Sequence, residues 1–289
     1  MFSVDAYSPE EIAKRVETVG VKKAGMPLTQ MLALSGLAGA FIAFGAVFYT
    51  VVVSGSTLGF GITRLLGGLA FSMGLVLVVL AGAELFTGNN LIAMAWASRK
   101  VSTADLVRGW ITVYAGNAVG AALILGLVLM ADTGSLGGGA VRDLAIATVV
   151  AKCELSIASA FARGVLCNTL VCLAVWLAMG GRSFVDKFFA VLFPVTAFVT
   201  VGFEHCIANL FFFTLGHRAL RRPLPGEPGH GQPRGGDPGQ LGGRHPSRRR
   251  DLLACIPTPR RKVRSEGWNL GSEAIHRETK VSLSSWRRL

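Results

Sequence analysis

The sequence predicts an all-α integral membrane protein in which two of the membrane-spanning helices are broken. Of its 289 residues 51% are hydrophobic, the mean hydropathy is +0.50, and only 16% are charged. A typical soluble domain is about one quarter charged. Five apolar stretches reach the length of about 20 residues that a helix needs to cross ~30 Å of hydrocarbon. Two of the five contain a polar string that begins Gly-x-Glu.

The order of segments along the chain predicts three parts. Residues 1–27 form a polar segment, residues 28–216 form a transmembrane domain, and residues 217–289 form a tail rich in Pro, Gly and Arg. The predicted spans cover residues 28–53, 65–97, 106–130, 155–179 and 184–215. The second and fifth exceed a single crossing, and each carries one of the polar strings.

The two polar strings occupy residues 82–90 and 202–209 and resemble each other. In each, an Asn follows the Glu by five positions, and Glu84 and Glu204 lie 120 residues apart. Polar groups at membrane depth persist where they face a protein interior or a watery path. Loosened helix backbone is tolerated in the same places. The strings therefore predict two helix breaks at Gly82 and Gly202 in an inverted repeat, the alternative being a chance likeness of two Gly-rich kinks.

The glutamates of these strings have a predicted structural role. A broken helix exposes backbone N–H groups, and a nearby carboxylate can accept hydrogen bonds from them. We therefore expect Glu84 and Glu204 to support the two breaks rather than to line a path. Glu204 need not face a path that its neighbour His205 lines, because successive helical residues point about 100° apart.

The charge distribution sets the expected partners and orientation. Residues 1–216 hold 13 Lys/Arg and 11 Asp/Glu, whereas residues 217–289 hold 16 and 6, so the tail contributes +10 of the net charge of +12. No nucleic-acid partner is predicted. Lys and Arg before the first span and in alternate loops predict a cytoplasmic N-terminus. Five crossings would then leave the basic tail outside, and no window after residue 216 supplies a sixth span. The tail has the composition of a disordered segment.

The sequence predicts neither a metal centre nor a cofactor. The five cysteines contain no CxxC pair, and their odd number does not indicate a disulfide framework. His205 is the single histidine within the apolar region, whereas a metal centre needs several ligands.

Four motifs in order resemble those of the formate/nitrite transporter family. They are residues 82–87 (GAELFT), 114–120 (YAGNAVG), 164–176 (GVLCNTLVCLAVW) and 202–209 (GFEHCIAN). The resemblance covers residues 5–216 and stops there. It implies an aquaporin-like fold with an inverted repeat, assembled as a homopentamer in the lipid bilayer of the inner (plasma) membrane. It also implies one pore in each protomer for small monovalent anions, formate or nitrite.

The resemblance assigns roles to residues of this chain. His205 matches the central pore residue, and Phe71 and Leu75 on one side and Phe198 on the other match the narrow apolar points. Thr87 matches the threonine of the broken second helix. Lys152 matches a basic residue of the outer vestibule, where we expect it to attract anions. Polar partners around the site are matched by Asn168, Asn209 and Glu204.

These residues have a chemistry suited to an anion path. A bare anion in low dielectric loses tens of kcal/mol of hydration energy, which the free N–H groups at half-helix N-termini can replace. An imidazole can change its protonation near neutral pH, so we expect His205 to stabilise the anion, with proton donation as one route. The alternatives are a hydrogen-bonded packing role for His205, lipid or core packing for the phenylalanines, and a Lys152 side chain that extends to the interface.

Other functions remain open at this stage. The anion could be hydrosulfide or another weak-acid anion. A membrane enzyme could use Glu204 and His205 as an acid–base pair, although no nucleophile or metal cluster accompanies them. The chain could also be a non-functional product whose sixth transmembrane helix was lost, with residues 217–289 arising from a frameshift.

Overall fold

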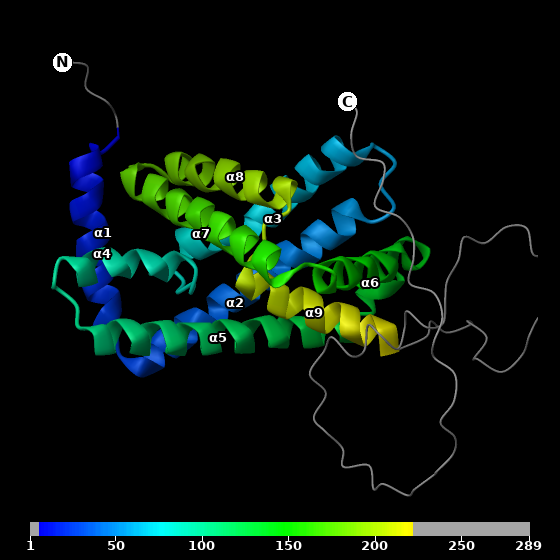
Figure 1. The fold of residues 1–289 in the computed structure, drawn as a ribbon, viewed down its shortest axis with the longest axis horizontal. Coiled ribbons are helices and arrows are strands. Elements are labelled where there is room, and N and C mark those ends of the chain that lie inside the picture. The colour runs from blue at the N-terminus through cyan, green and yellow to red at the C-terminus, as the bar shows by residue number, and fades with distance from the viewer. Residues whose placement is uncertain (1–5, 222–289) are drawn as a thin grey trace, which may run out of the picture. The chain divides into compact units, whose positions relative to one another are not determined.

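The computed structural model describes residues 6–221, and within that range the chain forms helices and no strand (Figure 1). The helices are α1 (Pro9–Ala24), α2 (Leu28–Val53), α3 (Phe60–Ala81), α4 (Ile92–Ala97), α5 (Thr103–Met130), α6 (Ala140–Cys153), α7 (Ile157–Gly180), α8 (Phe184–Val201) and α9 (Cys206–Arg221), with 3-10 turns at Gly88–Leu91 and Thr133–Gly139. Five of them, α2, α3, α5, α7 and α8, are long and apolar enough to cross a membrane. The predicted all-α membrane architecture is confirmed.

Serine side chains define where four of these helices begin. Ser8, Ser102, Ser156 and Ser183 each accept a hydrogen bond from the backbone N–H three residues further on. Such a cap satisfies a donor that has no partner inside the helix and contributes about 1 kcal/mol. The start of each of the helices α1, α5, α7 and α8 is therefore determined by its own local sequence.

Both predicted helix breaks are present. The helix α3 ends at Gly82 and α8 ends at Gly202, and both glycines adopt the left-handed conformation, with φ of 72° and 88°. A side chain is disfavoured there, so glycine allows each helix to stop at membrane depth. After the first break the chain continues as the 3-10 turn and α4, and after the second it continues as α9.

The helices around the two breaks pack in equivalent pairs. The short α4 packs against α1, and α9 packs against α6, while α3 and α8 cross each other between these two pairs (Figure 1). The pairs α2–α3 and α7–α8 also pack together. Neither α1 nor α6 was expected from the sequence, because both are too short or too polar to register as spans.

The contact between α2 and α5 depends on glycine. A Cβ added at Gly120 would lie 1.8 Å from the carbonyl oxygen of Gly36, and one at Gly116 would lie 1.8 Å from Oγ of Ser35. Small residues let membrane helices approach this closely. Within residues 6–221 no helix covers α7 in the way that α5 covers α2.

Of the predicted tail, the structure describes only residues 217–221. The helix α9 continues through Arg221, past the predicted tail boundary at residue 217. Residues 222–289, and with them the questions of a lost sixth helix and a frameshift, lie outside the described residues.

Candidate functional site

The buried centre of the structure is the pair His205 and Thr87, one from each break. Their Nε2 and Oγ1 atoms lie 3.2 Å apart, and both residues are 4% exposed. The backbone N–H of Ala208 donates to Nδ1 of His205 over 3.2 Å. Because Nδ1 accepts that bond, the neutral ring carries its proton on Nε2, the nitrogen that faces Thr87.

Two phenylalanine rings close around this histidine. Phe198, at the end of α8, stacks on the imidazole with ring centroids 5.9 Å apart, and Phe71, from α3, meets it at 6.4 Å. The two phenylalanines also touch each other edge-on at 6.0 Å. Leu75 lies one turn along α3 from Phe71 and belongs to the same buried cluster. The structure thus brings His205, Thr87, Phe71 and Phe198 together. It corrects one expectation, because Phe71 and Phe198 touch each other and line the same cavity, whereas the resemblance implied that they narrow the path on two different sides.

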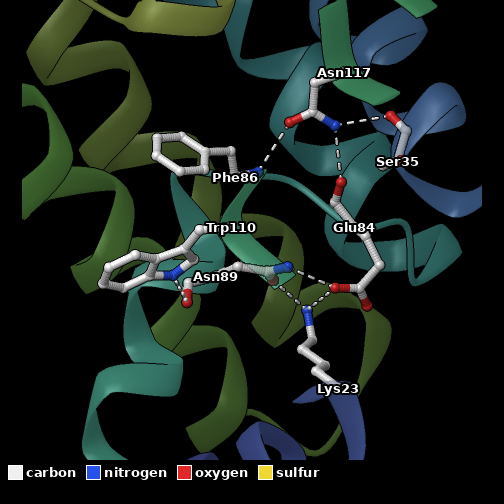
Figure 2. Close-up of polar contacts among 7 residues, drawn as sticks. All are labelled: Lys23, Ser35, Glu84, Phe86, Asn89, Trp110 and Asn117. Carbon is white, nitrogen blue, oxygen red and sulfur yellow. Dashed lines mark hydrogen bonds and ion pairs between the residues drawn. The ribbon is translucent and has the colours of Figure 1, made fainter. Parts of the chain in front are cut away.

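A Lys–Glu–Asn cluster stabilises the first break (Figure 2). Nζ of Lys23, at the end of α1, lies 3.1 Å from Oε2 of Glu84 and donates to Oδ1 of Asn89 over 2.8 Å. Nδ2 of Asn89 donates to the same carboxylate oxygen over 2.8 Å. The backbone N–H of Glu84 bonds to the carbonyl of Leu34 in α2.

The second break contains the matching cluster. Nζ of Lys152, at the end of α6, lies 2.6 Å from Oε2 of Glu204, and Nδ2 of Asn209 donates to that oxygen over 2.9 Å. The backbone N–H of Glu204 bonds to the carbonyl of Arg163 in α7. The Glu and Asn of the two clusters are 120 residues apart, and the Lys and the carbonyl acceptors are 129 apart. The inverted repeat therefore extends to individual hydrogen bonds.

These clusters correct the predicted role of the two glutamates. In residues 6–221 the carboxylates of Glu84 and Glu204 accept from Lys and Asn side chains, not from freed backbone N–H groups. The physical reason is that the N–H groups of both glutamates find carbonyl acceptors on neighbouring helices. A buried carboxylate then needs a cation, which α1 and α6 supply.

Asn117 of α5 fastens the first break from the other side (Figure 2). Its Nδ2 donates to the carbonyls of Ser35 and Glu84 over 2.7 and 2.9 Å, and its Oδ1 accepts from the N–H of Phe86 over 2.9 Å. The side chain is completely buried. The loop that carries Thr87 is therefore held by two hydrogen bonds to one amide, and the third bond ties that amide to α2.

Asn168 reaches the centre only through a cysteine. Its Nδ2 donates to Sγ of Cys172 over 3.6 Å, and that thiol donates to the carbonyl of Thr87 over 3.7 Å. Oδ1 of Asn168 and Oδ1 of Asn209 are buried and have no hydrogen-bond partner among residues 6–221. Asn168 thus supports the Thr87 loop and makes no hydrogen bond with His205.

A cavity of about 860 Å³ leads to His205 from the side on which α2 ends and α3 begins. We call it the vestibule. Phe71, Phe198 and His205 line it, together with four charged side chains. These are Arg64, Lys152, Arg163 and Glu204. Lys152 therefore lies in the vestibule as expected, but its charge is paired with Glu204. Within residues 6–221 no three His, Cys, Asp or Glu side chains gather as metal ligands would.

The sequence model of the family described as formate/nitrite transporter matches residues 10–222. The chain belongs to this family. It is 39% identical over 213 residues to the formate channel FocA of Escherichia coli (strain K12), a match that covers 73% of this chain and 75% of that protein. It is 38% identical over 230 residues to a probable formate transporter of Methanothermobacter thermautotrophicus, covering 72% and 82%.

Solved structures agree with the family. One, titled pentameric formate channel with formate bound, has a TM-score of 0.65 and 42% identity and covers 67% of this chain and 76% of that chain. Another, titled FNT family ion channel, has the same TM-score and 26% identity and covers 72% and 83%. The family consists of multi-pass membrane transporters, so the enzyme alternative falls. In the structure the carboxylate of Glu204 bonds to Lys152 and Asn209, and not to His205.

Sequence reasoning missed three contributors to this site. Lys23 and Cys172 were not singled out, and Asn117 was noted only as part of a motif. Lys23 precedes Lys152 by 129 residues, the spacing of the acceptors Leu34 and Arg163, but the two polar strings repeat at 120 residues, so their spacing did not point to Lys23. No local pattern marks Cys172, which acts by its position beside a loop 85 residues away.

Proposed function

We propose that this protein is a membrane channel for small monovalent anions, with formate as its substrate. The observation that carries the proposal is the buried Thr87–His205 pair, where the two helix breaks meet next to the rings of Phe71 and Phe198. Two donors face each other there at membrane depth. The relatives named above, which are formate channels or formate transporters by name, support the choice of anion.

The mechanism follows from the order of groups along the path. An anion that enters the vestibule meets the phenylalanine rings, which reject hydrated ions and admit a dehydrated one. Behind them, Nε2–H of His205 and the hydroxyl of Thr87 replace part of the lost hydration. Both groups are held in place, since backbone N–H of Ala208 orients the ring and Asn117 fastens the loop of Thr87. Proton transfer to the anion requires a ring that has first taken a second proton from water; that imidazolium returns to the neutral ring as the anion leaves as a neutral acid at lower cost.

The assembly and orientation are part of the same proposal. We place the N-terminus in the cytoplasm and the protein in the inner (plasma) membrane, so the vestibule faces outward. A homopentamer is supported by the solved structure titled as pentameric. Large apolar side chains remain exposed on the protomer, among them Phe161 at 74% and Phe193 at 67%, and lipid or neighbouring protomers would cover them.

Flux measurements with the full chain in proteoliposomes test the proposal. Wild type should carry formate, and His205→Asn should lose most of the flux and its dependence on pH between 5 and 8. Thr169→Val is the matched control, because Thr169 is exposed on α7 and bonds only to its own helix. Unchanged flux and pH dependence in His205→Asn would refute the role of the histidine.

The same assay separates the alternatives. Nitrite and hydrosulfide gradients should be dissipated more slowly than a formate gradient if formate is the substrate. Absence of flux for all three anions, with a correctly folded protein, would favour the non-functional alternative.

A further inference from the structure

The end of α8 in the vestibule is bound by two arginines. Arg64 of α3 donates from Nε to the carbonyl of Thr200 over 2.9 Å and from Nη2 to the carbonyl of Val199 over 2.8 Å. The hydroxyl of Thr200 donates back to the carbonyl of Arg64. Arg163 of α7 donates from Nη1 to the carbonyl of Gly202 over 3.4 Å. The last carbonyls of a helix have no partner within the helix, and here guanidinium groups supply them.

The first repeat has no such arrangement. Among the described residues, no Lys or Arg side chain donates to the carbonyls of residues 79–82, at the equivalent end of α3. Leu34 occupies the position of Arg163 in the repeat, because the two carbonyls that accept from the paired glutamates are 129 residues apart. The arginine cap is thus a specific feature of the vestibule end and does not follow from the repeat.

Electrostatics gives this end a consequence for anions. The C-terminus of a helix carries about half a negative charge, and α8 directs that end into the cavity beside Phe198. The charge of Lys152 is balanced by Glu204. No salt bridge within residues 6–221 involves Arg64 or Arg163, so they are the vestibule's uncompensated cations. A Cβ at Gly202 would lie 2.7 Å from Nη2 of Arg64, which places this guanidinium against the break itself.

We propose that Arg64 and Arg163 reverse the electrostatic sign of this entrance. They mask the negative end of α8, hold it in place in front of His205, and leave the vestibule positive, so that it collects anions from solution. The inference rests on the proposed anion conduction. It assigns to two arginines the attraction that the sequence alone assigned to Lys152.

A cysteine reporter tests the sign of the potential without any transport. Thr148→Cys places a thiol in the vestibule wall, and its rate of modification is compared for an anionic and a cationic methanethiosulfonate reagent. Protein with native Thr148 corrects for the other thiols. We expect the ratio of anionic to cationic rates to fall roughly tenfold in Arg64→Gln and in Arg163→Leu, the low end of electrostatic steering. Arg64→Lys keeps the charge and should keep most of the ratio.

The control is Arg142→Leu, which removes a cation of the same end of the protein whose guanidinium bonds to the carbonyl of Ala219 and does not line the vestibule. Formate uptake into proteoliposomes, measured in parallel, should fall with the ratio in Arg64→Gln and Arg163→Leu, and the difference from wild type should shrink as salt is raised. An unchanged rate ratio overturns the inference even if wild type carries formate. A falling ratio with no formate flux in wild type supports the inference and refutes the proposed function.

Discussion

Asn117→Ala should destabilise the protein more than any other single truncation in α5. The amide makes three hydrogen bonds of 2.7 to 2.9 Å, all to backbone groups, and is fully buried. Hydrogen bonds between membrane helices average about 0.6 kcal/mol, and a typical net value elsewhere is about 1 kcal/mol with a further cost for groups left unpaired. The expected loss is therefore about 2 to 5 kcal/mol in the free energy of unfolding.

The assay is reversible unfolding in mixed micelles of detergent and denaturant, followed by circular dichroism. Val119→Ala is the control, because Val119 lies two residues away and is 59% exposed, so its change should stay within about 0.5 kcal/mol. Formate flux should fall in parallel for Asn117→Ala, since the loop of Thr87 loses its support. A loss below about 0.5 kcal/mol in this variant would refute the conclusion that the amide holds the break.

Three further predictions concern packing, charge and pH. Gly120→Ala should cost about 1 to 3 kcal/mol in the same unfolding assay, because the added methyl group overpacks against α2. Gly126→Ala is the control and should be neutral or slightly stabilising, since an added Cβ there would meet nothing within 4 Å. Equal effects of the two changes would contradict the close approach of α2 and α5. Lys152→Met should cost about 3 to 5 kcal/mol, because it leaves the carboxylate of Glu204, which is only 12% exposed, without its cation. Adding Glu204→Gln should restore much of that loss in a double-mutant cycle, so simple additivity would argue against the pair. A side-chain hydrogen bond from a lysine before α5 lowers the pKa of Glu17 from its usual 4.5; the stabilisation of α1 is thus present above pH 4.5 and lost as pH falls through the lowered pKa. The protection factors of amides 9–24, which are exchange rates corrected for the intrinsic pH dependence of exchange, should fall only below pH 4.5 in wild type and should be low at all pH values in Glu17→Gln. Wild-type protection factors that do not change with pH would refute this prediction.

Much of the architecture was predictable because its causes are local. A span is recognisable from its own apolar length, and the breaks at Gly82 and Gly202 are recognisable because a Gly-x-Glu string is costly inside such a span. The likeness of the two strings predicted the repeat. The short α1 and α6 were missed, because they are amphipathic or moderately polar and carry no cost that stands out in the sequence.

The partners of the buried groups depended on contacts that sequence spacing does not record. Glu84 and Glu204 were recognised, but the cations that neutralise them come from helices 61 and 52 residues earlier in the chain. Lys152 was expected to attract anions. The structure pairs its ammonium with Glu204, and the arginines to which we assign this attraction were not marked by the sequence.

By itself, then, the sequence determined the membrane-spanning architecture, the two matched breaks and the family, because each follows from the composition and order of a short segment. Only the tertiary structure decided that Thr87 meets His205 across 118 residues, that Asn117 holds the first break, and that Arg64 caps α8 across 136. The physical reason is that a polar residue inside an apolar segment is visible in the sequence of that segment, whereas its hydrogen-bond partner depends on how the helices pack.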